Sequence, residues 1–289
     1  MSQSKILRFA TIAAMFEMYS IAMYYFFAPV LGVNFFFKAF DSSPFFIFAL
    51  FIFADYLARP IGAMVLGPYG DKCGRKQSLR ISLILLMIGA LAIACMPTYA
   101  VVGMAAPILV LVARVLQGFA AGGNTPGLIT MAIEASETGQ TGYCVARVFL
   151  GLVFGALLAY LVYTNLVFWT ANTAYQPYIW RIGIGISGVL MMIPLFMLMR
   201  VEEYPEFLSQ KAEKQLSQTP LDEFIRISGW FLLDALGGLA AVFVVLYMAF
   251  YAMPSYFEST VYLPMGEILL YYAAMLILMA FLLPLIGRL

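Results

Sequence analysis

Histidine is absent from this 289-residue chain, and charged residues make up only 11% of it. Without histidine the chain lacks the side chain that most often shuttles protons and binds transition metals. Its three cysteines, Cys73, Cys95 and Cys144, are too scattered for a metal motif or a disulfide framework. The formal net charge is only +1, which gives no reason to expect a nucleic acid as a partner.

The polar segments also lack the short motifs that mark ATP-binding loops, serine nucleophiles and zinc sites. We therefore predict no catalytic residue, no metal site and no cofactor. Neither an ATP-driven pump nor an enzyme is indicated.

Apolar residues are abundant instead, at 64% of the chain. A soluble domain of this length has too little polar surface to cover so many apolar side chains. Several apolar runs reach the roughly 20 residues that a helix needs to cross a bilayer. The sequence therefore predicts an all-α polytopic membrane protein that packs as a helical bundle. About eight transmembrane helices are expected, near 9–33, 44–66, 80–98, 107–133, 143–165, 178–199, 229–252 and 268–286.

Basic residues are concentrated in alternate loops, and this bias predicts the orientation. With a cytoplasmic N-terminus, only Lys38 among the basic loop residues lies outside. The predicted location is the plasma (inner) membrane, with both termini cytoplasmic. The cytoplasmic basic residues would be Lys5, Arg8, Lys72, Arg75, Lys76, Arg80, Arg200, Lys211, Lys214, Arg226 and Arg288.

The loop after the second span reads GPYGDKCGRKQSL, residues 67–79. Its basic residues are explained by topology alone, but topology requires neither an acid nor three closely spaced glycines. Glycines permit a tight turn and close helix ends, and an acid is favoured at a helix N-terminus. We keep two interpretations open, a merely topological signal and a tight turn in which the acid sits against a helix N-terminus. The residues concerned are Gly67, Gly70, Asp71, Gly74, Arg75 and Lys76.

The pattern Gly-x-x-x-Asp-x-x-Gly-Arg-Lys-x-x-Leu resembles the signature loop of the major facilitator superfamily. Further segments resemble its metabolite:proton symporter branch, which includes the proline/betaine, α-ketoglutarate and shikimate permeases. The resemblance covers nearly all of residues 9–289. The segments are FEMYSIAMYYFFAPVLG, DYLARPIGAMVLG, RVLQGFAAGGNTPG, YIWRIGIGISGVL and MRVEEYPEF.

The resemblance implies two six-helix halves that rock around a central site and give alternating access. Residues 1–200 would form the six-helix N-terminal half, 201–228 a central cytoplasmic linker, and 229–289 the first two helices of an incomplete second half. It also implies that Asp71 engages a helix of the second half and stabilises one conformation. The chain alone is then not expected to complete the transport cycle, and three outcomes stay open: it is unstable, it is completed by a second polypeptide that supplies the missing helices, or it is a non-functional remnant.

In the first span, Glu17, Ser20 and Tyr24 lie three and four residues apart and share one helical face. An ionisable group near the bilayer midplane is costly unless it is paired or hydrated, which makes Glu17 a candidate for the solute or proton path. A neutral carboxyl hydrogen-bonded between packed helices is the alternative. The metabolite:proton symporter branch, which this sequence resembles, carries an acid where this chain has Ser20.

The second span holds Asp55 and Arg59, which are four residues apart and are predicted to form a structural ion pair. The fourth span holds Arg114 and Gln117 on one side, and Arg114 is the candidate anion or counter-charge site. Asn124 stands where the resembled branch carries a glutamate.

Glycines shape the same fourth span. Gly118 and Gly122 form a small-xxx-small pair that predicts close helix packing. The run from Gly122 to Gly127, which includes Pro126, predicts a weakened helix whose freed backbone groups line a cavity.

Two hypotheses for function remain. The first is a secondary active transporter that moves a small polar organic solute, a carboxylate or a zwitterionic osmolyte, by proton symport. The second is a truncated, transport-incompetent remnant or a scaffold-like membrane protein, since the chain ends after the eighth span. The expected partners of the chain are the lipid bilayer and, for a transporter, the solute and protons.

Overall fold

The structure, a computed structural model, describes residues 3–36, 44–170, 178–200 and 265–288, and all its regular elements in these ranges are helices. They are α1 (Gln3–Phe35), α2 (Pro44–Cys73), α3 (Arg75–Cys95), α4 (Tyr99–Val102), α5 (Ala105–Glu134), α6 (Thr141–Thr170), α7 (Ile179–Leu190), α8 (Met192–Met199) and α12 (Met265–Ile286).

Seven of the eight expected spans coincide with these helices, and α7 with α8 forms the sixth. The span expected at 229–252 and the linker expected at 201–228 lie outside the described residues. Within the described ranges, five stretches have the length and hydropathy of a membrane span. They are Gln3–Ala28, Arg75–Cys95, Ala105–Glu134, Thr141–Thr170 and Ile179–Met199. The protein is an all-helical, multi-pass membrane protein.

The second helix extends further than its apolar run. It continues through Gly67 and Gly70 to Cys73, and the chain turns at Gly74 with a φ of 110°. Residues with a side chain rarely adopt this backbone conformation, so a glycine is suited to the turn between α2 and α3. The basic loop of the sequence is therefore mostly helix.

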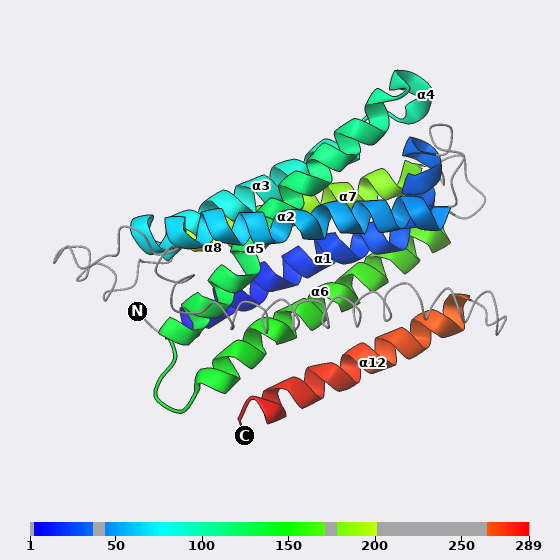
Figure 1. Ribbon diagram of the computed structural model, residues 1–289. Coiled ribbons are helices and arrows are strands. Elements are labelled where there is room, and N and C mark those ends of the chain that lie inside the picture. The colour runs from blue at the N-terminus through cyan, green and yellow to red at the C-terminus, as the bar shows by residue number, and fades with distance from the viewer. Residues whose placement is uncertain (1–2, 37–43, 171–177, 201–264, 289) are drawn as a thin grey trace.

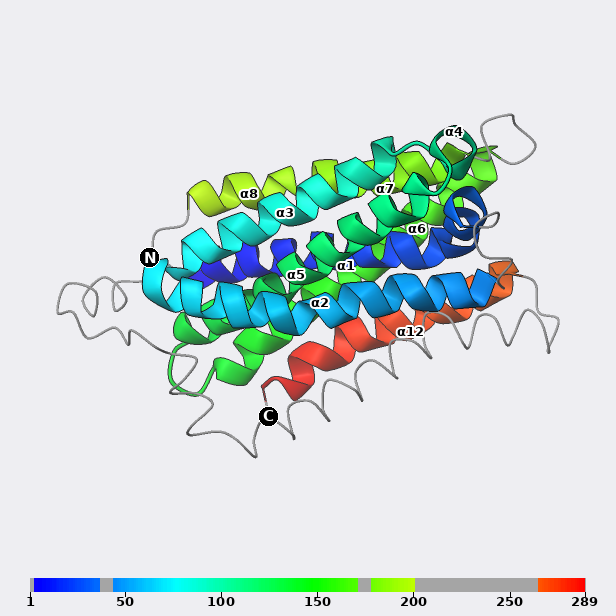
Figure 2. The ribbon, with the colours of Figure 1, turned by 45° about the horizontal axis from the view of Figure 1, so that its top comes forward.

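The long helices lie roughly along one direction (Figures 1 and 2). α1 packs mainly on α6 and also on α5 and α7, α2 packs on α5, α3 packs on α5 and α7, and α12 lies along α6. The start of α1, the α2–α3 turn and the end of α12 lie at one end of the bundle, and α4 lies at the other.

Three apolar clusters fill the bundle among the described residues; Met18 of α1 belongs to the smallest, and α1 also contributes to the two larger ones. One of the larger clusters includes Phe9, Leu83 and Leu128, and the other includes Phe27 and Trp180. Along α1 the first cluster ends at residue 16 and the second begins at residue 19. The buried Glu17 of α1 lies in the gap between them.

Candidate functional site

Backbone contact between α2 and α5 fixes the register of the site. A Cβ at Gly118 would overlap the carbonyl of Asp55, and one at Gly122 would overlap the carbonyl of Arg59. The close helix packing predicted for this glycine pair is confirmed. It places Asp55 and Arg59 directly beside the part of α5 that carries Arg114.

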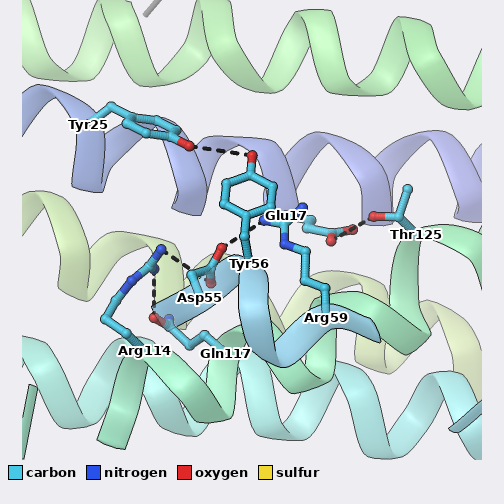
Figure 3. Close-up of polar contacts among 8 residues, drawn as sticks. All are labelled: Glu17, Tyr25, Asp55, Tyr56, Arg59, Arg114, Gln117 and Thr125. Atoms are coloured by element: carbon cyan, nitrogen blue, oxygen red, sulfur yellow. Dashed lines mark hydrogen bonds and ion pairs between the residues drawn. The ribbon is translucent and has the colours of Figure 1, made fainter. Parts of the chain in front are cut away.

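Two arginines converge on the carboxylate of Asp55 (Figure 3). Arg59 donates from Nη2 to Oδ2 of Asp55 over 2.9 Å, and Arg114 Nη2 lies 3.2 Å from Oδ1. The Asp55 and Arg114 side chains are only 3% and 6% exposed, and that of Arg59 is 22% exposed. We call Asp55, Arg59 and Arg114 the buried cluster. The Asp55–Arg59 pairing follows the spacing in the sequence, but the contact with Arg114 was not foreseen.

Arg114 is held by two further neighbours. Its Nη1 donates to Oε1 of Gln117 over 3.1 Å, and its Cζ lies 4.3 Å from the centre of the Tyr24 ring. Gln117 donates in turn to the Tyr24 hydroxyl over 3.2 Å. Gly89 on α3 leaves room for Gln117, because a Cβ there would approach Cγ of Gln117 too closely. The guanidinium is thus held in place by more than its ion pair.

Glu17 lies at the same interface, one to two helical turns before Tyr24 on α1. Its carboxyl accepts hydrogen bonds from Nδ2 of Asn124 over 2.8 Å and from Oγ1 of Thr125 over 2.7 Å. Glu17 is 1% exposed and Asn124 is fully buried. Oδ1 of Asn124 has no hydrogen-bond partner. A buried acid that bonds only to neutral donors is costly to ionise in hydrocarbon.

The charges of the buried cluster do not cancel. One carboxylate faces two guanidinium groups, so the cluster carries a formal charge of +1 from Asp55, Arg59 and Arg114. Glu17 is close enough to contribute to the electrostatic environment of Arg59. Leaving an uncompensated charge buried is expensive.

Ser20 is directed elsewhere. Its hydroxyl bonds to that of Ser187 on α7 over 3.3 Å, and both residues are buried. The structure therefore brings Glu17, Tyr24, Arg114, Gln117 and Asn124 together between α1 and α5, and it places Ser20 on the α7 side of α1.

The signature residues lie at the α2–α3 end of the bundle. Arg75 forms ion pairs with Asp71 over 2.8 Å and with Glu134 of α5 over 3.3 Å. The side chains of Asp71, Arg75 and Glu134 are 43%, 25% and 32% exposed, and we call them the rim cluster. Lys76 donates to the carbonyl of Met199 over 3.3 Å.

The predicted weakening of the fourth span is wrong, because α5 is continuous from Ala105 to Glu134. Its glycines serve packing instead. Gly122 contacts the Arg59 carbonyl, and Cβ atoms at Gly123 and Gly127 would press on Leu66 and Leu79. A proline removes one backbone donor and neighbouring helices hold the remaining turns, so the helix continues through Pro126.

Sequence reasoning missed Thr125, Glu134 and the hydroxyl contact of Tyr25 with Tyr56 over 3.4 Å. Thr125 adjoins the candidate Asn124, and a hydroxyl next to a buried amide was an available signal. Glu134 and the tyrosine pair had none, since their partners lie on other helices.

Known proteins share both the sequence pattern and the fold. The profile of the family described as Sugar (and other) transporter matches residues 7–234. A putative proline/betaine transporter of Staphylococcus aureus (strain MSSA476) is 31% identical over 252 residues, which are 85% of this chain and 53% of that protein. The proline/betaine transporter of Salmonella typhimurium (strain LT2) is 30% identical over 290 aligned residues, 97% of this chain and 58% of that protein. The chain thus spans about half the length of these curated relatives.

Two solved structures have the same fold. A proton:xylose symporter of the major facilitator superfamily, bound to 6-bromo-6-deoxy-D-glucose, superposes with a TM-score of 0.79 and 16% identity. The match covers 99% of this chain and 68% of that one. The E. coli xylose transporter in a partially occluded inward-open conformation gives a TM-score of 0.67 and 17% identity, over 99% of this chain and 70% of that one. At these identities the likeness concerns the fold alone.

Proposed function

Since the chain belongs to the sugar (and other) transporter family of the major facilitator superfamily, we propose that it takes part in moving a small polar organic solute across the membrane. The solute is a carboxylate or a zwitterionic osmolyte, and it passes by alternating access. The proline/betaine transporters similar to this chain support that class of solute. In this proposal residues 1–200 are the N-terminal half, 201–228 the linker, and 229–289 part of the second half.

The observation that carries the proposal is the excess positive charge of the buried cluster. The buried guanidinium of Arg114 and the partly exposed one of Arg59 share one carboxylate, so the site has a spare cation for the carboxylate of a solute. Arg114 would bind the solute. The path of the solute would be lined by Glu17, Tyr24, Gln117 and Asn124. Ser20 would lie on the side of α1 that faces α7.

Proton coupling needs a carboxyl that changes its charge along the path. Ser20 and Asn124 stand where the resembled branch carries acids, so we propose weak proton coupling through Glu17 or facilitated transport. Restoring both acids, Ser20→Asp with Asn124→Glu, should make uptake more sensitive to an uncoupler. Strong, uncoupler-sensitive accumulation by the unaltered chain would contradict this proposal.

The signature residues have a separate role in the proposal. Gly67, Gly70, Asp71, Gly74, Arg75 and Lys76 form a cytoplasmic latch that stabilises one conformation, in a plasma membrane protein with cytoplasmic termini. The exposed Cys73 ends α2, next to the α2–α3 turn, and the exposed Cys95 ends α3 at the other end of the bundle. The two native cysteines can therefore report which end of the bundle faces the cytoplasm. An impermeant maleimide added to intact cells should label Cys95 and spare Cys73; the reverse pattern would invert the orientation.

Solute uptake is the direct test of the function. Cells that express the chain would be given radiolabelled L-proline, glycine betaine or α-ketoglutarate, with and without an uncoupler. Arg114→Gln should abolish uptake. The matched control is Arg80→Gln, which changes an exposed arginine on α3.

Saturable uptake by the chain alone would remove the need for a second polypeptide. If no solute is taken up by cells that contain correctly inserted chain, the proposal of a transporter fails. A scaffold-like membrane protein then remains as the alternative.

A further inference from the structure

In the buried cluster the carboxylate of Asp55 has a shorter contact with Arg59 and a longer one with Arg114. Oδ2 of Asp55 is 2.9 Å from Arg59, and Oδ1 is 3.2 Å from Arg114. Arg59 lies four residues after Asp55 on the same helix, so this pair is kept whenever α2 stays helical. The pair with Arg114 joins two helices and is the one that can be exchanged.

Arg114 binds Asp55 with only part of its hydrogen-bonding edge. The Nε–H and one Nη2–H of a guanidinium point in the same direction and together fit the two oxygens of a carboxylate. Asp55 occupies Nη2, while Nε of Arg114 is buried without a hydrogen-bond partner. A second carboxylate would satisfy both groups at once, which Asp55 does not.

Departure of Asp55 would not release Arg114. The Tyr24 ring and Oε1 of Gln117 hold the guanidinium independently of Asp55. The contact of Gly118 with the Asp55 backbone keeps α2 and α5 in register. Arg114 is therefore already oriented for a ligand, and little ordering would accompany binding.

We propose that Asp55 substitutes for the carboxylate of the solute in the empty site. On binding, the solute carboxylate displaces Asp55 from Arg114, and Asp55 stays paired with Arg59. This inference rests on the proposed function, because it says how the same site exchanges its internal anion for the solute. The exchange leaves two neutral pairs, Asp55 with Arg59 and the solute with Arg114, where the empty cluster carries a charge of +1. Arg59 is thus a positioning residue that makes the exchange possible.

The test is a rescue by a second substitution. In Arg59→Gln, solute binding would leave Asp55 as an unpaired buried carboxylate. We expect affinity for carboxylate solutes to fall about tenfold to a hundredfold, since breaking a buried charge pair at a binding site has an effect of this order. The double variant Asp55→Asn with Arg59→Gln removes the carboxylate that competes with the solute for Arg114, and it removes the partner of that carboxylate. The formal charge of the cluster stays at +1. Affinity should then return to within about twofold of the original chain, or exceed it.

Binding would be measured by calorimetry on the purified full chain in detergent, with glycine betaine, L-proline and α-ketoglutarate as probes. L-prolinamide, which lacks the carboxylate, should bind weakly to the original chain and to every variant. Arg80→Gln serves as the surface control. If Arg59→Gln does not fold, Arg59→Lys replaces it: the cation is kept, so affinity should stay within about threefold of the original chain, although the planar fork is lost.

Three results would overturn the inference: a double variant that binds as poorly as Arg59→Gln, an Arg59→Gln variant that binds like the original chain, or an original chain that binds none of the carboxylates. The last result would reject the exchange but leave the proposed function intact if cells that express the chain still take up a carboxylate solute. Conversely, rescue of binding without any uptake in cells would retain the exchange and reject the transporter.

Discussion

The buried cluster and the rim cluster are built on the same plan but differ in charge and surroundings. Each contains an aspartate and an arginine four residues apart, Asp55 with Arg59 and Asp71 with Arg75, and each reaches a charged residue on α5. In the buried cluster that residue is Arg114, and the formal charge is +1. In the rim cluster it is Glu134, and the formal charge is −1.

Exposure determines what each cluster can do. Ion pairs between solvent-exposed groups contribute about 0–1 kcal/mol, so the rim cluster adds little stability and is easily rearranged. Buried charges are not screened by water, and removing one partner of a buried pair costs about 3–5 kcal/mol. The buried cluster keeps an unbalanced cation despite that cost, which supports the proposal that it binds a solute.

The largest effect is expected from Asp55→Asn, which leaves the buried Arg114 and the partly exposed Arg59 without a carboxylate. We expect the free energy of unfolding to fall by about 3–5 kcal/mol, with a large loss of folded chain on thermal unfolding in detergent. Asp71→Asn makes the same chemical change at the rim and should cost no more than about 1 kcal/mol. Equal melting temperatures for the two variants would show that burial does not distinguish the clusters.

A smaller loss is expected from Gly118→Ala, which places a methyl group against the Asp55 carbonyl. Forcing α2 and α5 apart should cost about 1–3 kcal/mol in stability and should weaken solute binding, because the register of the buried cluster shifts. Gly67→Ala is the matched control, since no atom lies within 4 Å of a Cβ built there. That variant should be neutral or slightly more stable, because alanine favours helix over glycine by about 1 kcal/mol. Similar losses for both glycines would rule out a specific role for the α2–α5 contact.

Glu134→Gln should have the smallest effect. Arg75 keeps Asp71 as a partner, and the side chains concerned are partly exposed. We expect a change of less than about 1 kcal/mol in unfolding free energy, and it should vanish in about 1 M salt because screening shortens the range of exposed charges to a few ångströms. The loss caused by Asp55→Asn should persist in the same salt. If salt removed both effects, the cluster around Asp55 would be accessible to water.

Most of the helical framework was predictable from the sequence, because long apolar runs, glycines and prolines act locally. The Asp55–Arg59 pair was predictable for the same reason, since both residues lie one turn apart on one helix. The contact of Arg114 with Asp55 and that of Ser20 with Ser187 were not, because they depend on how different helices are rotated against each other. The continuity of α5 through Pro126 also depends on neighbouring helices, which compensate a weak local propensity.

Arg114 distinguishes the two clusters most directly, because its removal should separate binding from stability. Arg114→Gln leaves the neutral Asp55–Arg59 pair, so the melting temperature should stay equal or rise. Binding of glycine betaine or L-proline to the purified chain, measured by calorimetry, should become undetectable. Arg75→Gln at the rim should leave that binding unchanged. Solute binding that survives Arg114→Gln in a folded chain would contradict the assignment of the buried cluster as the solute site.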